Sequence, residues 1–381
     1  MSGAVTILVA KGEQDRVLID NPEISFFRTK FKRHVNFAQC VLSQTAEGTP
    51  SPDSSSTCTF AKKGDMMSYI YLTKKDNGVL QSDITNGDIK NVEFLIGGQV
   101  IDSITTDQLV SMRNMNSKYP QTFRGSESPS TGELGFYNTY HYPLGFWFCE
   151  HWQSAIPLVG LQYHDVQIRI SWGDTVQPST ISFEIWVNYI YLDTTEREYF
   201  ANSAPKDSLM YQHSQTDPGN SDLSLTLPFN NPVAFLFGKV GTTDIFGQSI
   251  PNVTDKIQVT INGVDIVDQK ELVPHYTIIP TMYHTTYGKW SVYDPILDIT
   301  VTKVGPTVID VVVLKELATH VSFVYPFCLI CSQLQPTGSC NFSRVDEVRL
   351  NSTRAITKQI YARSYNVLRI DKGMGGLMYS T

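Results

Sequence analysis

The stretch FLIGG at residues 94–98 has a counterpart, VTING, at residues 259–263. Each is a short apolar run that leads into a turn containing glycine. A second pair, residues 146–165 and residues 327–346, has equal lengths, and each member runs from aromatic residues through a proline-containing loop into an alternating segment. The two pairs follow the same order. The sequence therefore indicates that its two halves are copies of one fold.

Alternation of apolar and polar residues with a period of two is the main secondary-structure signal in both halves. In the first half it is clearest at residues 166–172 and 181–189. In the second half it is clearest at residues 223–227, 257–261 and 297–301. Segments of this kind are strands with one buried face. The sequence therefore predicts an all-β protein.

Helical signals are few. Thr105 with Gln108, and Asp193 with Glu196, each fit a capping box, in which the first side chain accepts a backbone N–H and the second reaches back toward the cap. We expect short connector helices at these two places. Residues 1–10 have no basic region before their apolar run, so we expect no secretory signal.

Length, composition and charge limit the class of protein. The chain has 381 residues, which is long for one β-sandwich and sufficient for two. Hydrophobic residues make up 41% and charged residues 18%, which favours packed cores over disorder. The net charge of −7 removes the usual electrostatic source of nucleic-acid affinity. Six scattered cysteines do not form a disulfide scaffold and favour a reducing compartment.

Four ordered stretches resemble the major capsid proteins of nucleocytoplasmic large DNA viruses, the group that includes iridoviruses, phycodnaviruses and mimiviruses. They are residues 3–38 (GAVTILVAKGEQDRVLIDNPEISFFRTKFKRHVNFA), 146–168 (FWFCEHWQSAIPLVGLQYHDVQI), 335–346 (QPTGSCNFSRVD) and 365–380 (YNVLRIDKGMGGLMYS). Because these stretches extend from one end of the sequence to the other, the resemblance covers essentially the whole chain.

The resemblance implies a double jelly roll, with two eight-stranded antiparallel β-sandwiches in tandem and short connector helices. We expect an N-terminal arm at residues 1–21, a first jelly roll at residues 22–204 and a second at residues 205–381. The implied function is that of a viral major capsid protein. It would form a homotrimer that serves as a pseudo-hexagonal capsomer, and neighbouring capsomers would build an icosahedral shell. The implied location is the virion, after assembly in the host cytoplasm.

A basic cluster, defined as Arg28, Lys30, Lys32 and Arg33, is interleaved with phenylalanines. Taken alone, these residues fit either a solvated strand edge or a surface for anionic lipid or nucleic acid. The resemblance favours a contact on the inner face of the shell, with minor capsid proteins and an internal viral membrane as partners. We expect no specific contact with nucleic acid.

Two groups of residues invite a chemical role. Cys328 and Cys331 form a lone CxxC with no second pair at zinc spacing. Positions i and i+3 of a strand point to opposite faces, so we expect both thiols to pack in the core. His164 beside Asp165, with His141 and His151 nearby, lacks any hydrolase or metal motif, and we expect structural histidines. The sequence therefore predicts no catalytic residue, no metal, no cofactor and no enzyme.

Two other functions fit a β-sandwich. A jelly-roll lectin or receptor-binding spike would present ligand loops at one end, and it would differ from a capsid protein by binding glycans without forming hexagonal arrays. A cupin-like metalloenzyme would need a His-x-His plus Glu ligand set, which is absent from the sequence. We therefore keep the lectin or spike as the alternative to the capsid function.

Overall fold

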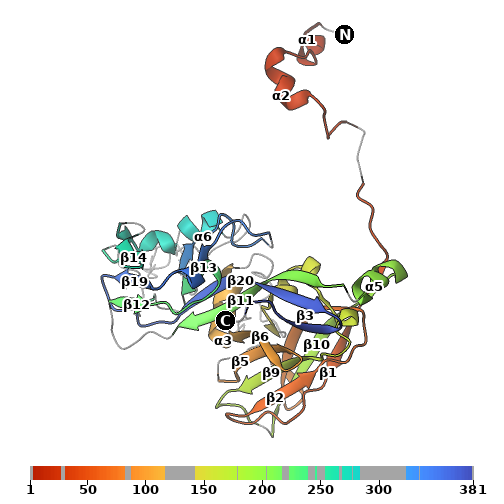
Figure 1. Cartoon of the computed structure of the whole chain (residues 1–381), viewed down its shortest axis with the longest axis vertical. Coiled ribbons are helices and arrows are strands. Elements are labelled where there is room, and N and C mark those ends of the chain that lie inside the picture. The colour runs from red at the N-terminus through yellow and green to blue at the C-terminus, as the bar shows by residue number, and fades with distance from the viewer. Residues whose placement is uncertain are drawn as a thin grey trace, which may run out of the picture. The chain divides into compact units, whose positions relative to one another are not determined.

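The computed structural model describes residues 3–26, 31–81, 87–115, 142–177, 179–202, 204–216, 223–238, 245–246, 254–265, 268–276, 278–283, 323–333 and 335–379. Two compact units divide the chain, one at residues 1–37 and the other at residues 38–381. The described residues are mostly β-strands joined by short helices and turns (Figure 1).

The N-terminal unit contains two short α-helices, α1 (Gly3–Leu8) and α2 (Arg16–Ile19), with the 3-10 turn η1 (Glu13–Asp15) between them. The Asp15 carboxylate accepts the Gly12 N–H at 3.2 Å. None of the residues in these three elements is buried. The predicted end of the arm, at residue 21, lies inside this unit.

The first sandwich consists of two antiparallel sheets. Its main strands are β1 (Phe37–Gln44), β2 (Ser55–Thr59), β3 (Met66–Asp76), β4 (Val79–Gln81), β5 (Ile89–Ile96), β6 (Gln99–Thr105), β9 (Val166–Trp172) and β10 (Ile181–Leu192). One sheet has the order β1-β10-β3-β4 and the other the order β2-β9-β5-β6. The short strands β7 (Tyr142–Pro143) and β8 (Ile156–Pro157) pair with β3.

The second sandwich repeats this plan. Its main strands are β11 (Lys206–Thr216), β12 (Ser224–Thr226), β13 (Pro232–Gly238), β14 (Lys256–Ile261), β15 (Val264–Asp265), β17 (Val324–Pro326), β19 (Val348–Ser352) and β20 (Ile360–Asp371). Its sheets have the orders β11-β20-β13-β17 and β12-β19-β14-β15. Three short strands are added, namely β16 (Lys270–Glu271), β18 (Cys340–Asn341) and β21 (Met374–Leu377).

The sheets β2-β9-β5-β6 and β12-β19-β14-β15 correspond one to one, so that β5 matches β14, β6 matches β15 and β9 matches β19. In the other pair of sheets, β1, β10 and β3 match β11, β20 and β13, whereas β17 comes at the point in the chain where the first sandwich has β7, which also pairs with β3. The repeated stretches FLIGG and VTING therefore occupy equivalent places, each at the end of a strand and the start of a hairpin. The predicted tandem of β-sandwiches is confirmed. The predicted boundary near residue 205 falls just before β11.

The alternation predicted from sequence holds where one face of a strand is buried. In β9, Val166, Ile168, Ile170 and Trp172 are all buried, and the residues between them are half-exposed. In β14, Ile257 and Val259 are buried in the same way. The predicted strand at residues 297–301 lies outside the described residues.

Both predicted connector helices are present. Helix α3 (Thr106–Met115) follows Thr105, whose Oγ1 accepts the Gln108 N–H at 3.3 Å. Helix α5 (Thr194–Ala201) follows Asp193, whose side chain makes no capping bond. The remaining helical elements are α4 (Trp147–Glu150), η2 (Trp152–Ser154), η3 (Leu158–Gly160), η4 (Val273–His275), α6 (Ile278–Tyr283) and η5 (Phe342–Arg344).

The sheet β11-β20-β13-β17 is covered on both faces (Figure 1). Phe235 and Phe237 of β13 belong to a core that they share with the first sandwich, whereas Val233 and Leu236 pack in the core of the second. This double burial explains why β13 reads PVAFLFG, a continuous apolar run without alternation.

The C-terminal hairpin of β20 and β21 contacts the first sandwich. The Tyr163 N–H donates to the Gly373 carbonyl oxygen at 3.0 Å. A Cβ atom at Gly373 would lie 2.7 Å from Cδ2 of Tyr163, and one at Gly375 would lie 2.7 Å from Cδ2 of Leu161. The glycine-rich tail is therefore a hairpin that approaches the first sandwich closely because it lacks side chains.

The contribution of this contact is testable with two matched glycines. Gly373 and Gly78 both occupy hairpin turns, with φ of +81° and +79°, but a Cβ at Gly78 meets no atom within 4 Å. Gly78→Ala should cost roughly 1 kcal/mol through backbone strain alone. Gly373→Ala should cost clearly more, because it also displaces Tyr163. Equal losses in chemical denaturation would show that the hairpin contact does not stabilise the fold.

Candidate functional site: the N-terminal unit and the junction between the sandwiches

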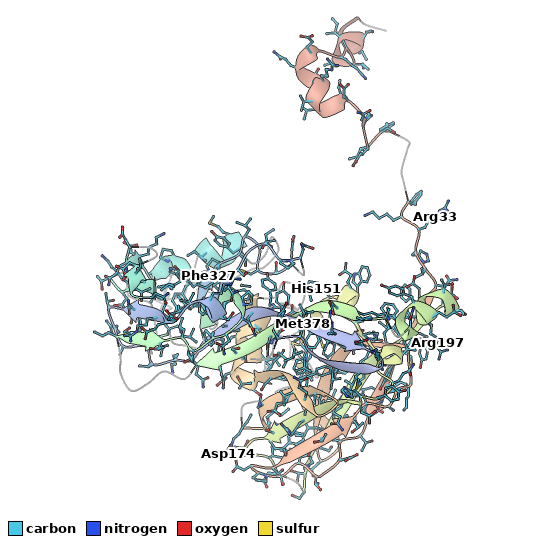
Figure 2. The ribbon with its side chains drawn as sticks, viewed as in Figure 1. Arg33, His151, Asp174, Arg197, Phe327 and Met378 are labelled. Atoms are coloured by element: carbon cyan, nitrogen blue, oxygen red, sulfur yellow. The ribbon has the colours of Figure 1, made fainter. Side chains whose placement is uncertain are left out.

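The structure describes only half of the predicted basic cluster. Arg28 and Lys30 lie outside the described residues, whereas Lys32 and Arg33 are described and exposed. Figure 2 shows the side chain of Arg33 on the extended segment that leads toward β1. The role assigned to the cluster stays a prediction.

The N-terminal unit also carries exposed apolar side chains. Val17 is 92% exposed and Phe31 88% exposed. Other large apolar residues of the unit share this exposure: Ile7, Leu8, Val9, Leu18, Ile24 and Phe26. Grouped exposed apolar side chains mark contact sites, so this unit has the character of a docking segment. The sequence analysis missed them, although the runs AVTILVA and RVLI were a visible signal.

His164, one of the histidines considered as an acid–base group, has a structural contact. His164 Nδ1 lies 2.9 Å from the carbonyl oxygen and 3.2 Å from the nitrogen of Gly375, so this ring joins the first sandwich to the C-terminal hairpin. Asp165 instead pairs with Lys62 at 3.3 Å on the surface. His141 lies outside the described residues.

The two CxxC thiols are buried, as expected, but the expected geometry was wrong. Their Sγ atoms are 3.3 Å apart rather than on opposite faces. The rule for strands does not apply because β17 ends at Pro326, and the chain then turns before Cys328 and Cys331. The pair lies in the core shared by the two sandwiches.

A buried ion pair crosses the junction between the sandwiches. Nη2 of Arg363, on β20, lies 2.5 Å from Oε2 of Glu150, on α4, and both side chains are almost fully buried. The guanidinium also stacks over the ring of Tyr211, with Cζ 3.8 Å from the ring centroid. Burial lowers the pKa of Arg363, but the charge of Glu150 and the contact with Tyr211 more than offset it, so the pKa is raised.

A second buried pair lies at the same junction. Asp102 of β6 and His213 of β11 are both fully buried, with Oδ2 2.8 Å from Nδ1. The other oxygen of Asp102 accepts the backbone N–H of His213 at 2.9 Å. One carboxylate therefore fixes both the ring and the backbone of a residue in the other sandwich.

The described residues offer little for catalysis. No group of three His, Cys, Asp or Glu side chains among them is placed to hold a metal ion. A hollow of about 270 Å³ is lined by Gly160, Gln162, Tyr163, Ala201, Asn202, Ala204, Ile370, Lys372 and Gly373, a set without a carboxylate, histidine or thiol. Among the helices that the structure describes, none has the length and hydrophobicity of a membrane span.

Known proteins are similar to this chain along its whole length. The family described as "Major capsid protein N-terminus" matches residues 25–193, which include all strands of the first sandwich. The major capsid protein of Pyramimonas orientalis virus is 31% identical over 404 residues, and the match covers 100% of both chains. The chain belongs to the viral major capsid protein family.

Further comparisons agree with this family. The major capsid protein of Paramecium bursaria Chlorella virus 1 is 28% identical over 470 residues, again with 100% of both chains covered. The crystal structure of PBCV-1 VP54 has a TM-score of 0.70 at 24% identity, covering 94% of this chain and 100% of that one. The Faustovirus major capsid protein has a TM-score of 0.62 at 11% identity, with 93% and 94% covered. The predicted double jelly roll is confirmed.

The junction of this capsid protein was not predicted from its sequence. Glu150 and Arg363 are 213 positions apart, so no local pattern pairs them. Each is a single charge in an apolar neighbourhood, FWFCE and IYARSY, and that was the available signal. A lone charge in such a run is rarely buried without a partner.

The ion pair of the capsid protein can be tested by a double-mutant cycle. Glu150→Leu or Arg363→Met alone should each cost about 3–5 kcal/mol in the free energy of unfolding, because the remaining charge is buried without its partner. Combining Glu150→Leu with Arg363→Met should cost less than either single change. The exposed pair Asp207–Arg369 is the control, and its removal should change stability little. Additive losses at Glu150 and Arg363 would argue against coupling.

Proposed function

We propose that three copies of this capsid protein form a homotrimer that serves as a pseudo-hexagonal capsomer. The observation that carries the proposal is the strand plan that the two sandwiches share, in which seven of the eight main described strands correspond. Three chains with two like sandwiches each supply six similar units, which suits a near-hexagonal block in a closed shell. Neighbouring capsomers then pack edge to edge, as an icosahedral capsid requires.

We also propose a role for each domain of the chain and a location for its assembly. The two jelly rolls, at residues 22–204 and 205–381, form the capsomer block. The arm at residues 1–21 contacts a partner. Function lies in extended surfaces, so the protein has no catalytic activity. Assembly takes place in the host cytoplasm, before the chain becomes part of the virion.

We also propose that the basic cluster, Arg28, Lys30, Lys32 and Arg33, binds partners on the inner face of the shell. The chain as a whole has a net charge of −7, so a local group of positive charges attracts an acidic partner more strongly than the rest of the surface does. Exposed apolar residues beside the cluster support docking. Minor capsid proteins and an internal viral membrane fit this chemistry, and no specific nucleic-acid contact is involved.

The oligomeric state provides the first test. Native mass spectrometry of the purified chain should give a trimer, and electron microscopy should show hexagonal blocks that pack into arrays. The reason is that each chain supplies two similar sandwiches, so three chains are needed to give six units and sixfold pseudo-symmetry. A monomer or dimer, or an oligomer that binds glycans without forming arrays, would contradict the capsomer and favour the lectin or spike.

The basic cluster provides the second test. Changing Arg28, Lys30, Lys32 and Arg33 together to Gln should leave trimers folded but lower the yield of particles and their sensitivity to salt, because the attraction to an acidic inner layer is lost. The control removes four exposed charges from the sandwiches, at Lys63, Lys256, Lys270 and Arg344. Normal particles with unchanged salt sensitivity would refute an acidic partner. Unfolded trimers would assign the cluster a structural role.

A further inference from the structure

Cys328 and Cys331 are two free thiols held in contact. Their Sγ atoms are 3.3 Å apart, and the residues are 4% and 3% exposed. A disulfide places the two sulfurs about 2 Å apart, so bond formation requires a movement of little more than an ångström. By contrast, the thiol of Cys149, elsewhere in the same core, donates to the Ser68 carbonyl oxygen.

The loop that carries the two thiols is fixed by its own hydrogen bonds. Thr337 Oγ1 accepts the Ile330 N–H at 2.9 Å and donates to the Ile330 carbonyl oxygen at 3.2 Å. The Cys331 N–H donates to the carbonyl oxygen of Tyr283 at 2.7 Å. These bonds hold the loop between Cys328 and Cys331 in the conformation that brings the sulfurs together. Because the fold already restricts the backbone of this loop, less conformational entropy is lost when the disulfide closes.

The two thiols differ electrostatically. The hydrogen bond from Cys331 lowers the pKa of Cys328, and the nearby Arg363 guanidinium acts in the same direction. The hydrogen bond to Cys328, together with burial, raises the pKa of Cys331. Cys328 is therefore the first of the two to ionise, and a thiolate is the attacking species in thiol–disulfide exchange.

We propose that Cys328 and Cys331 form a redox site, which closes to an intramolecular disulfide by exchange with a low-molecular-weight disulfide. The Cys328 thiolate attacks one sulfur of the small disulfide, whose S–S bond breaks and releases one thiolate. Cys331 gives its proton to that thiolate and attacks Sγ of Cys328 in the mixed disulfide. The second small thiolate leaves and takes from solvent the proton that Cys328 released when it ionised. Two electrons pass to the small disulfide, and two small thiols are released. The reaction proceeds through opening of the loop, whose tip at Leu329 is 70% exposed.

The effect of closure is local. The bond joins residues three positions apart, so it closes only a very short loop of the unfolded chain. The same loop contacts the junction, where Tyr211 Oη donates to the carbonyl oxygen of Gln333. Closure therefore restricts the motion of the loop next to this junction.

The decisive experiment compares the folded chain with an unstructured reference. The reduced full-length chain and a synthetic peptide of residues 325–333 are each equilibrated over a series of ratios of glutathione disulfide to glutathione. Samples are quenched in acid, denatured, alkylated and mapped by mass spectrometry. The folded chain should be half closed at a ratio at least about tenfold lower than the peptide, because the fold holds the sulfurs in contact. An equal or higher ratio would overturn the proposal.

Substitutions identify the sulfurs involved. Cys328→Ala and Cys331→Ala should each abolish internal closure and leave the remaining thiol to be alkylated or to carry glutathione. Cys340→Ala is the matched control, because it removes the third cysteine of the same tryptic peptide, and closure should be unchanged. A protected pair of cysteines that survives Cys328→Ala, or that disappears with Cys340→Ala, would place the disulfide elsewhere and refute this site.

Discussion

The structure depends on one sheet that is buried on both faces. Strands β13 and β20 direct Phe235, Phe237 and Tyr361 into a core shared with the first sandwich, and Val233 and Ile360 into the core of the second. Neither sandwich is complete without the other, because an apolar face of this extent is unfavourable in water. The two jelly rolls therefore depend on each other for their stability.

Buried polar pairs give this apolar contact its orientation. Hydrophobic surfaces pack in several registers at similar cost, whereas a buried charge tolerates only the register that supplies its partner. Glu150 with Arg363, and Asp102 with His213, each take one member from each sandwich. The two pairs together define the rotation and translation of one sandwich on the other. A shell built from repeated subunits needs this accuracy more than it needs extra stability.

The sequence showed the parts of the fold that follow local rules. Strands such as β9 were predicted because one face is buried and the residues alternate. Strand β13 is buried on both faces, so nearly all of its residues are apolar and no alternation is visible in the sequence. The ion pairs of the junction could not be predicted from local sequence patterns, because the two partners of each pair lie in different halves of the chain. The thiols were misplaced because a rule for strands was applied to residues that follow the end of β17. Contacts between residues far apart in the chain, and the geometry beyond the end of a strand, could not be predicted from the sequence.

The equivalent hairpin turns of the two sandwiches have different neighbours. In the first sandwich, Ile96 beside the turn is fully buried and contacts the C-terminal hairpin near Gly375. In the second, the turn is occupied by its own chain, since Asn262 Oδ1 accepts the N–H groups of Asp346 and Glu347. The first sandwich therefore receives the hairpin that the second one extends. The two sandwiches are alike in strand plan but not interchangeable, so any symmetry that relates them is approximate.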